Sequence, residues 1–143
     1  MTKRMLLALM AMAGVAIATY LTLYKTGAIG ELVCTVGSCE TVNTSKWSVF
    51  LGFPVAAWGL AFYVLLLAVT LAGVQDRWSS SLAVSRALVG LTAWGVLFSG
   101  WLTYLELFVI HAICVWCVTS AVLVAAMFAV SLLEYREQVA AQR

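Results

Sequence analysis

The chain has few charged residues, a single proline and a single histidine. Eight of its 143 residues are Lys or Arg and six are Asp or Glu, so 10% are charged, against about 25% in soluble domains. Such low charge excludes an acidic or basic disordered tail, and one proline excludes a proline-rich linker. The net charge of +2 is too small to predict nucleic-acid binding.

The sequence has more apolar residues than a soluble protein. Apolar residues make up 64% of the chain, whereas about 45–50% is typical of soluble proteins, and the mean hydropathy is +1.05. A soluble fold of this length has no place for so much apolar surface, because its own surface must be largely polar. The composition therefore predicts an integral membrane protein, surrounded by lipid.

Four apolar windows are long enough to cross a membrane as helices, which takes roughly 20 residues. They cover residues 5–24, 55–74, 87–110 and 113–133. The sequence lacks the period-2 patterning, with turns about every 10 residues, that is typical of membrane β-barrels. We therefore predict an all-α integral membrane protein. It would form a four-transmembrane-helix bundle as a single domain over residues 1–143, with an outer loop at 25–54.

The first window also resembles a cleavable signal peptide. Lys3 and Arg4 precede its apolar run, and Ala16-Ile17-Ala18 resembles a cleavage site. The run nevertheless continues through Leu23, which is longer than the ~7–15 residues usual for such a signal. We therefore predict a helix that is retained in the membrane.

Lys and Arg are distributed unequally between the two sides of such a bundle. The side with the first loop and the last turn has only Lys25 and Lys46, whereas the side with both termini has Lys3, Arg4, Arg77, Arg86, Arg136 and Arg143. Cytoplasmic loops carry an excess of positive charge. We therefore expect both termini in the cytoplasm and the first loop outside, in the cytoplasmic membrane of a bacterium or archaeon.

All four cysteines fall on this predicted outer side. Cys34 and Cys39 lie in the first outer loop, and Cys114 and Cys117 begin the fourth window. Outside the cytoplasm, disulfides form and persist. Four cysteines allow three complete pairings, and two inert structural disulfides are one interpretation of the pattern.

The spacing Cys114-Val115-Trp116-Cys117 is a C-x-x-C motif at the N-terminus of a helix. That position lowers the pKa of Cys114 and makes it reactive, while Cys117 would lie one turn deeper. A dithiol with one end in water and one facing hydrocarbon suits electron transfer from an aqueous protein to a membrane-dissolved carrier. His111 would either add positive charge and relay protons, or simply be a polar residue of an interfacial turn.

The segment between Cys39 and the second window predicts a short interfacial helix. Thr44 or Ser45 would cap its start and Gly52 its end, and one apolar face would be formed by Trp47, Phe50 and Leu51. Such a helix is either a lid over a quinone-sized pocket or a plain membrane-surface helix. The sequence favours neither strongly.

Together, and in this order, these motifs resemble the vitamin K epoxide reductase family, its bacterial and archaeal members most closely. The resemblance rests on the loop cysteine pair, Ser-Lys-Trp at 45–47, Gly-Phe-Pro at 52–54 and the C-x-x-C, and it runs from about Met5 to Leu133. It implies a four-helix bundle around a quinone site. Electrons would pass from a thioredoxin-fold (DsbA-like) partner to ubiquinone or menaquinone, without a metal.

The resemblance also implies a role for each motif. Cys34 would exchange with the partner, Cys39 would relay to Cys114, and Cys117 would face and reduce the quinone. The start of the second helix would match the family at Gly52, Pro54 and Gly59. By the resemblance, Ser45 would lie near the active site. Together with Trp47, Phe50 and His111, which the local pattern singles out, it would bind the quinone or support the active site.

Three departures from the family pattern concern the substrate and the loop. Val55 stands where the vertebrate enzyme has a quinone-binding asparagine, Ala121 stands where it has a tyrosine, and the loop cysteines are separated by fewer residues than usual. The first two favour plain quinone reduction over epoxide reduction. The sequence ends at Arg143 with no fused thioredoxin-like domain, so a separate partner protein is expected.

Two other functions remain as alternatives. DsbB performs the same chemistry on a four-helix bundle, but it has its C-x-x-C in the first outer loop, the reverse of the order here. A heavy-metal-binding or transporting membrane protein would capture soft metals with the thiolates. Such a carrier is expected to have cysteines or relay residues inside the membrane, and no window has them near its centre. The leading hypothesis is a membrane thiol:quinone oxidoreductase.

Overall fold

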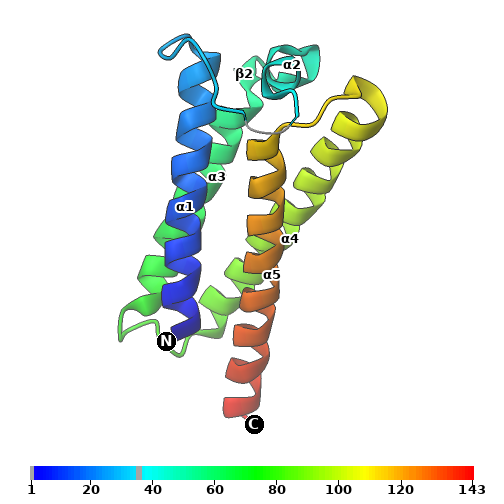
Figure 1. Ribbon diagram of the computed structural model, residues 1–143. Coiled ribbons are helices and arrows are strands. Elements are labelled where there is room, and N and C mark those ends of the chain that lie inside the picture. Colours follow the sequence, from blue (N-terminus) through cyan, green and yellow to red (C-terminus); the bar gives the residue numbers. More distant parts are fainter. Residues whose placement is uncertain (1, 35–36) are drawn as a thin grey trace.

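The computed structural model describes residues 2–34 and 37–143, and it is built almost entirely of helices (Figure 1). Four helical segments in these residues are long and apolar enough to cross a membrane: Thr2–Lys25 (α1), Val55–Val74 (α3), Leu82–Ile110 (α4 and its continuation) and Val115–Ala141 (α5). The predicted four-helix membrane bundle is thereby confirmed. Helix α5 continues well past residue 133, because the polar residues that follow are good helix formers.

The two ends of the bundle differ in what they hold. Both termini lie at one end, and the outer loop with helix α2 (Cys39–Thr44) lies at the other (Figure 1). Helix α1 packs along α3, and α4 packs along α5. Toward the end with α2, helix α4 diverges from α5 (Figure 1), so the bundle is wider there.

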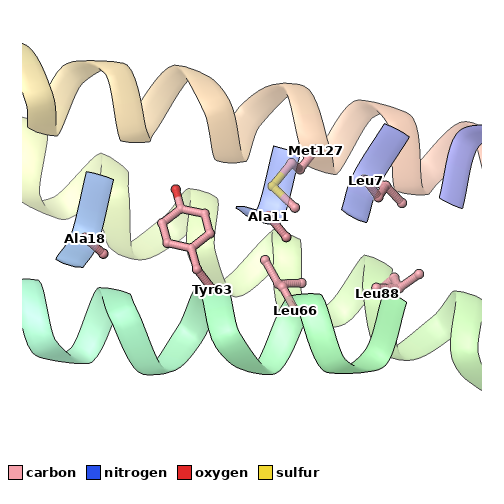
Figure 2. Close-up of a cluster of buried hydrophobic side chains, with 7 residues drawn as sticks. All are labelled: Leu7, Ala11, Ala18, Tyr63, Leu66, Leu88 and Met127. Carbon is pink, nitrogen blue, oxygen red and sulfur yellow. The ribbon is translucent and has the colours of Figure 1, made fainter. Parts of the chain in front are cut away.

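Close helix packing fills the middle of the bundle. Figure 2 shows the buried cluster, which consists of Leu7, Ala11, Ala18, Tyr63, Leu66, Leu88 and Met127. At two positions the packing requires glycine, because a Cβ on Gly14 would overlap the Tyr63 ring and a Cβ on Gly95 would overlap Phe62. Helix α1 supplies three members of this cluster, Leu7, Ala11 and Ala18.

A buried ion pair closes the end that holds the termini. The Arg4 guanidinium donates to Glu134 Oε1 at 2.9 Å, and the two residues are only 1% and 4% exposed. The same guanidinium donates to three carbonyl oxygens and one hydroxyl group, those of Gly73, Trp78, Ser81 and Ser85. One side chain of α1 thus ties together α3, the following loop, α4 and α5.

The outer loop differs from the predicted helix over residues 44–52. Helix α2 ends at Thr44, a 3-10 turn (η1) covers Lys46–Ser48, and strands β1 (Val49–Phe50) and β2 (Phe53–Pro54) form a hairpin. Ser45 has extended backbone angles and lies between the two helices, as the C-cap of α2 and the N-cap of η1, and it makes no side-chain capping hydrogen bond to η1. The hairpin turn uses two positive φ angles, +53° at Leu51 and +84° at Gly52, and β-branched and aromatic residues flank it. The prediction of a short helix in this loop is confirmed, but its position was wrong.

Candidate active site

The two cysteine pairs meet at the end of the bundle that holds α2. Cys34 and Cys39 form a disulfide, whereas Cys114 and Cys117 are thiols. Cys39 and Cys114 are both buried in one apolar cluster, and the other two cysteines pack against it. Residues about eighty positions apart in the sequence are therefore neighbours in the fold.

A short backbone pairing holds the loop against the start of α5. Gly37 and Cys114 form an antiparallel bridge, and the Ser38 N–H donates to the Ile113 carbonyl at 2.7 Å. Gly37 has a φ of +88°, and a Cβ at this position would overlap the Ile113 carbonyl oxygen. Only glycine fits without strain, and the pairing brings Cys39 close to Cys114.

Asn43 links the two cysteine pairs directly. This residue of α2 is buried, and its Nδ2 donates to the Cys39 carbonyl at 2.9 Å and to Cys114 Sγ at 3.6 Å. We did not predict this residue from the sequence. Its signal is the four-residue spacing from Cys39, which places both on one face once a helix is known to start at Cys39.

Two aromatic side chains hold the chain just before Cys34. The Trp116 indole N–H donates to the Val33 carbonyl at 2.6 Å, and the Val33 N–H donates to the Tyr20 hydroxyl at 2.8 Å. The two rings meet edge to face, with centroids 5.1 Å apart. Trp116, which lies between the two cysteines of the C-x-x-C motif, therefore holds the loop that carries the disulfide.

Cys114 is fully covered by the outer loop, with 0% of its surface exposed. The expectation that this end of the dithiol faces water is wrong, because the Gly37 bridge and α2 lie over it. Its pKa is nevertheless lowered to about 7, chiefly by a hydrogen bond from the Cys117 side chain and also by the backbone N–H groups of Trp116 and Cys117. Burial acts in the opposite direction. Cys114 is thus a buried thiol that gives up its proton more readily than an ordinary cysteine.

A cavity of about 540 Å³ lies in the outer half of the bundle and has Cys117 on its wall. Helices α1, α3, α4 and α5 and the outer loop all contribute to its mostly apolar lining. Three of the predicted support residues, Ser45, Trp47 and Phe50, belong to this lining. Its size and lining are typical of a small-molecule site.

His111, the fourth predicted support residue, lies outside this lining. It is exposed, with a φ of +56°, and its backbone N–H donates to the Glu106 carbonyl. In the structure it ends the π-helical turn η2 (Leu105–Ile110) that continues α4.

The apolar wall contains a few polar groups that the sequence pattern did not bring together. Glu106 is 4% exposed, and its Oε2 accepts the Cys114 N–H at 3.2 Å. Tyr63 and Ser120 share a hydrogen bond of 2.7 Å. Lys25 donates to the Asn43 carbonyl and to Ser48 Oγ, at 2.9 and 2.8 Å. Val55 also lines the cavity and has no side-chain hydrogen-bonding group.

In residues 2–34 and 37–143, no group of three or more His, Cys, Asp or Glu side chains is placed to hold a metal ion. The cysteines form one disulfide, Cys34–Cys39, and one pair of thiols, Cys114 and Cys117, of which Cys117 lines the cavity.

A comparison with protein families agrees with this arrangement. The model of the Vitamin K epoxide reductase family matches residues 5–132, which is nearly the whole chain. The chain belongs to this family. It is accordingly a membrane oxidoreductase with a redox-active disulfide, of a family whose reactions are linked to quinones.

Proposed function

We propose that this chain is a thiol:quinone oxidoreductase that reoxidises a thioredoxin-fold protein outside the cytoplasm. It would pass the electrons to a quinone and so support disulfide formation in secreted proteins. One observation carries the proposal: the Cys114–Cys117 dithiol lies between the loop disulfide and an apolar cavity. Each pair of cysteines therefore has a neighbour with which it can exchange electrons.

The first step would take place at the loop disulfide. Cys34 is less buried than Cys39, so a thiolate of the reduced partner would attack Cys34 Sγ and break its bond to Cys39. The second thiol of the partner would then displace Cys34. The partner leaves oxidised, and the two loop cysteines become thiols.

The second step would return the loop to its disulfide form. Cys39 would attack Cys114 of an oxidised Cys114–Cys117 pair, and Cys34 would then release Cys114 by attacking Cys39. The products are a loop disulfide and two thiols at Cys114 and Cys117, which is the state found in the structure. The Gly37 bridge and Asn43 hold Cys39 and Cys114 together for this exchange.

The last step would use the cavity. Its volume and apolar lining fit a quinone ring, which would accept two electrons and two protons as Cys114 and Cys117 form a disulfide. Cys117 is the thiol on the wall, and Trp47, Phe50 and Ser45 would enclose the ring and exclude water. With Val55 in place of the family asparagine, we propose plain quinone reduction and not epoxide reduction.

The proposed orientation follows from charge. Both termini lie at the end of the bundle opposite to the cysteines (Figure 1), and six of the eight Lys and Arg residues were assigned to the side of the termini from the sequence. By the positive-inside rule, the termini would face the cytoplasm and the cysteines the outside, where a thioredoxin-fold partner meets oxidising conditions.

The test uses purified protein in detergent or lipid. Given a reduced DsbA-like protein, it should reduce a ubiquinone or menaquinone analogue in a one-to-one ratio with partner disulfides formed. Dithiothreitol in place of the partner separates the two halves of the reaction. Folded protein that reduces neither quinone analogue with either donor would contradict the proposal.

A further inference from the structure

We propose that Glu106 carries one of the two protons that pass from the thiols to the quinone, an inference that rests on the proposed function. The side chain lies at the place where such a carrier is needed. Its carboxylate contacts the backbone of Cys114 on one side and lines the same cavity as Cys117 on the other. No other carboxyl group is among the described residues of that lining.

The local backbone directs this side chain inward. At Leu105 the helix changes from α to π spacing, and such π turns are frequent at functional sites. The Glu106 carbonyl accepts two N–H groups, from His111 and, at 3.0 Å, from Ala112. The chain thus folds back on Glu106, which brings Cys114 within reach of its carboxylate.

The surroundings of Glu106 suit a group that gains and loses a proton. The ion pairs formed by the described residues are Lys3–Glu137 and Arg4–Glu134, so no cation of this part of the chain is paired with it. The titratable groups that share its cavity are Lys25 from α1, Tyr63 from α3 and Cys117 from α5. Lys25 already donates to Asn43 and Ser48. A buried carboxyl group without a cation is easily protonated.

The step balances as follows. Cys114 and Cys117 lose two protons and two electrons as one S–S bond forms, and the quinone gains both. The Glu106 carboxyl group gives its proton to a quinone oxygen and takes up the proton of the Cys114 thiol. The second proton comes from the Cys117 thiol, and the Glu106 carboxyl group is again protonated at the end.

Glu106→Gln tests this proposal because the amide oxygen can still accept the Cys114 N–H while the amide group carries no acidic proton. We expect kcat for quinone reduction to fall about 100-fold or more, with KM for the quinone within about twofold. Reduction of its cysteine pairs by dithiothreitol should be unchanged. The matched control is Glu31→Gln, which removes an exposed carboxylate at the same end of the molecule and should retain full activity.

Glu106→Asp distinguishes loss of the acidic proton from a change in the position of the side-chain group. It restores the acidic proton at a shorter reach, so it should be at least tenfold faster than Glu106→Gln. Equal loss in both variants, or Glu106→Gln with more than half of the wild-type kcat, would overturn the proposal. If the wild type itself reduces no quinone although its thiols exchange, the proposed function fails and not this inference alone.

A readout without quinone gives an independent check, and it does not need the Gln variant to be active. In infrared spectra of the dithiol form, the band of a protonated carboxyl group should be present in the wild type and in Glu31→Gln, and absent in Glu106→Gln. The same carboxyl spectrum in all three proteins would show that Glu106 does not hold a proton in the dithiol form, and that would overturn the proposal.

Discussion

Each end of this bundle buries a glutamate, and the two glutamates differ in their partners. Glu134 is paired with Arg4, whose guanidinium also bonds three carbonyl groups. Glu106 instead lies beside a thiol pair and a cavity, where the backbone N–H of Cys114 is its hydrogen-bond donor. A buried carboxylate that is paired with a cation, as Glu134 is through its Oε1, locks helices together, whereas one beside reactive groups is available for chemistry.

For the end of the bundle that holds the cysteines, the sharpest test is Cys117→Ala. Because Cys117 is the thiol on the cavity wall, we expect quinone reduction to fall to the background level, a loss of at least about 1,000-fold. Quinone reduction with dithiothreitol as donor is the measurement. In contrast, Cys34→Ala should lose activity with the protein partner but keep much of it with dithiothreitol. Full activity of Cys34→Ala with the partner would contradict the assigned roles.

The end of the bundle that holds the termini is tested by Arg4→Met, which leaves Glu134 buried without its cation. We expect a loss of about 3 kcal/mol in the free energy of unfolding, measured by thermal or denaturant unfolding in detergent, with KM for the quinone unchanged. Lys3→Met is the matched control, because it removes an exposed ion pair worth under about 1 kcal/mol. Equal stability of the two variants would show that the buried pair is not a structural lock.

The contact between loop and bundle is tested by Gly37→Ala. The positive φ and the overlap with the Ile113 carbonyl should cost about 1–3 kcal/mol. The bridge would open, and electron transfer from the loop thiols to the C-x-x-C pair should slow at least about tenfold, as measured by rapid-quench trapping of thiols. Gly30→Ala, where a Cβ meets nothing within 4 Å, should behave as the wild type. Equal rates in both variants would contradict the role of the bridge.

The smallest effect concerns the pH dependence of Cys114. With a pKa of about 7 instead of the ordinary 9.0, Cys114 should be half thiolate near neutral pH, and its thiolate should be lost as the pH falls below 7. Thiolate absorbance in the ultraviolet is the measurement, with Cys114→Ala as the blank. Because Cys117 is the main cause of the shift, Cys117→Ala should move the titration upward. A titration near the ordinary value in the wild type would contradict this account.

Many residues of the site could be predicted from local sequence patterns. The C-x-x-C motif at a helix start placed Cys114 and Cys117. Ser45, Trp47 and Phe50 line the cavity in the structure, and their role at a quinone site stays a prediction. The predicted helix over residues 44–52 was wrong because helical spacing of three apolar residues also occurs by chance. In the structure, two residues with positive φ turn the chain into a hairpin instead.

By itself, the sequence determined the four membrane spans and the end of the bundle at which the cysteines gather. Both follow from local quantities, the length of apolar runs and the order of charges and cysteines between them. Only the tertiary structure decided that Cys114 is covered by the loop, that Asn43 joins the two pairs, and that Glu106 reaches the thiols. The Asn43–Cys114 contact, for example, joins residues 71 positions apart. Such contacts depend on how the helices and the loop pack, which no local pattern records.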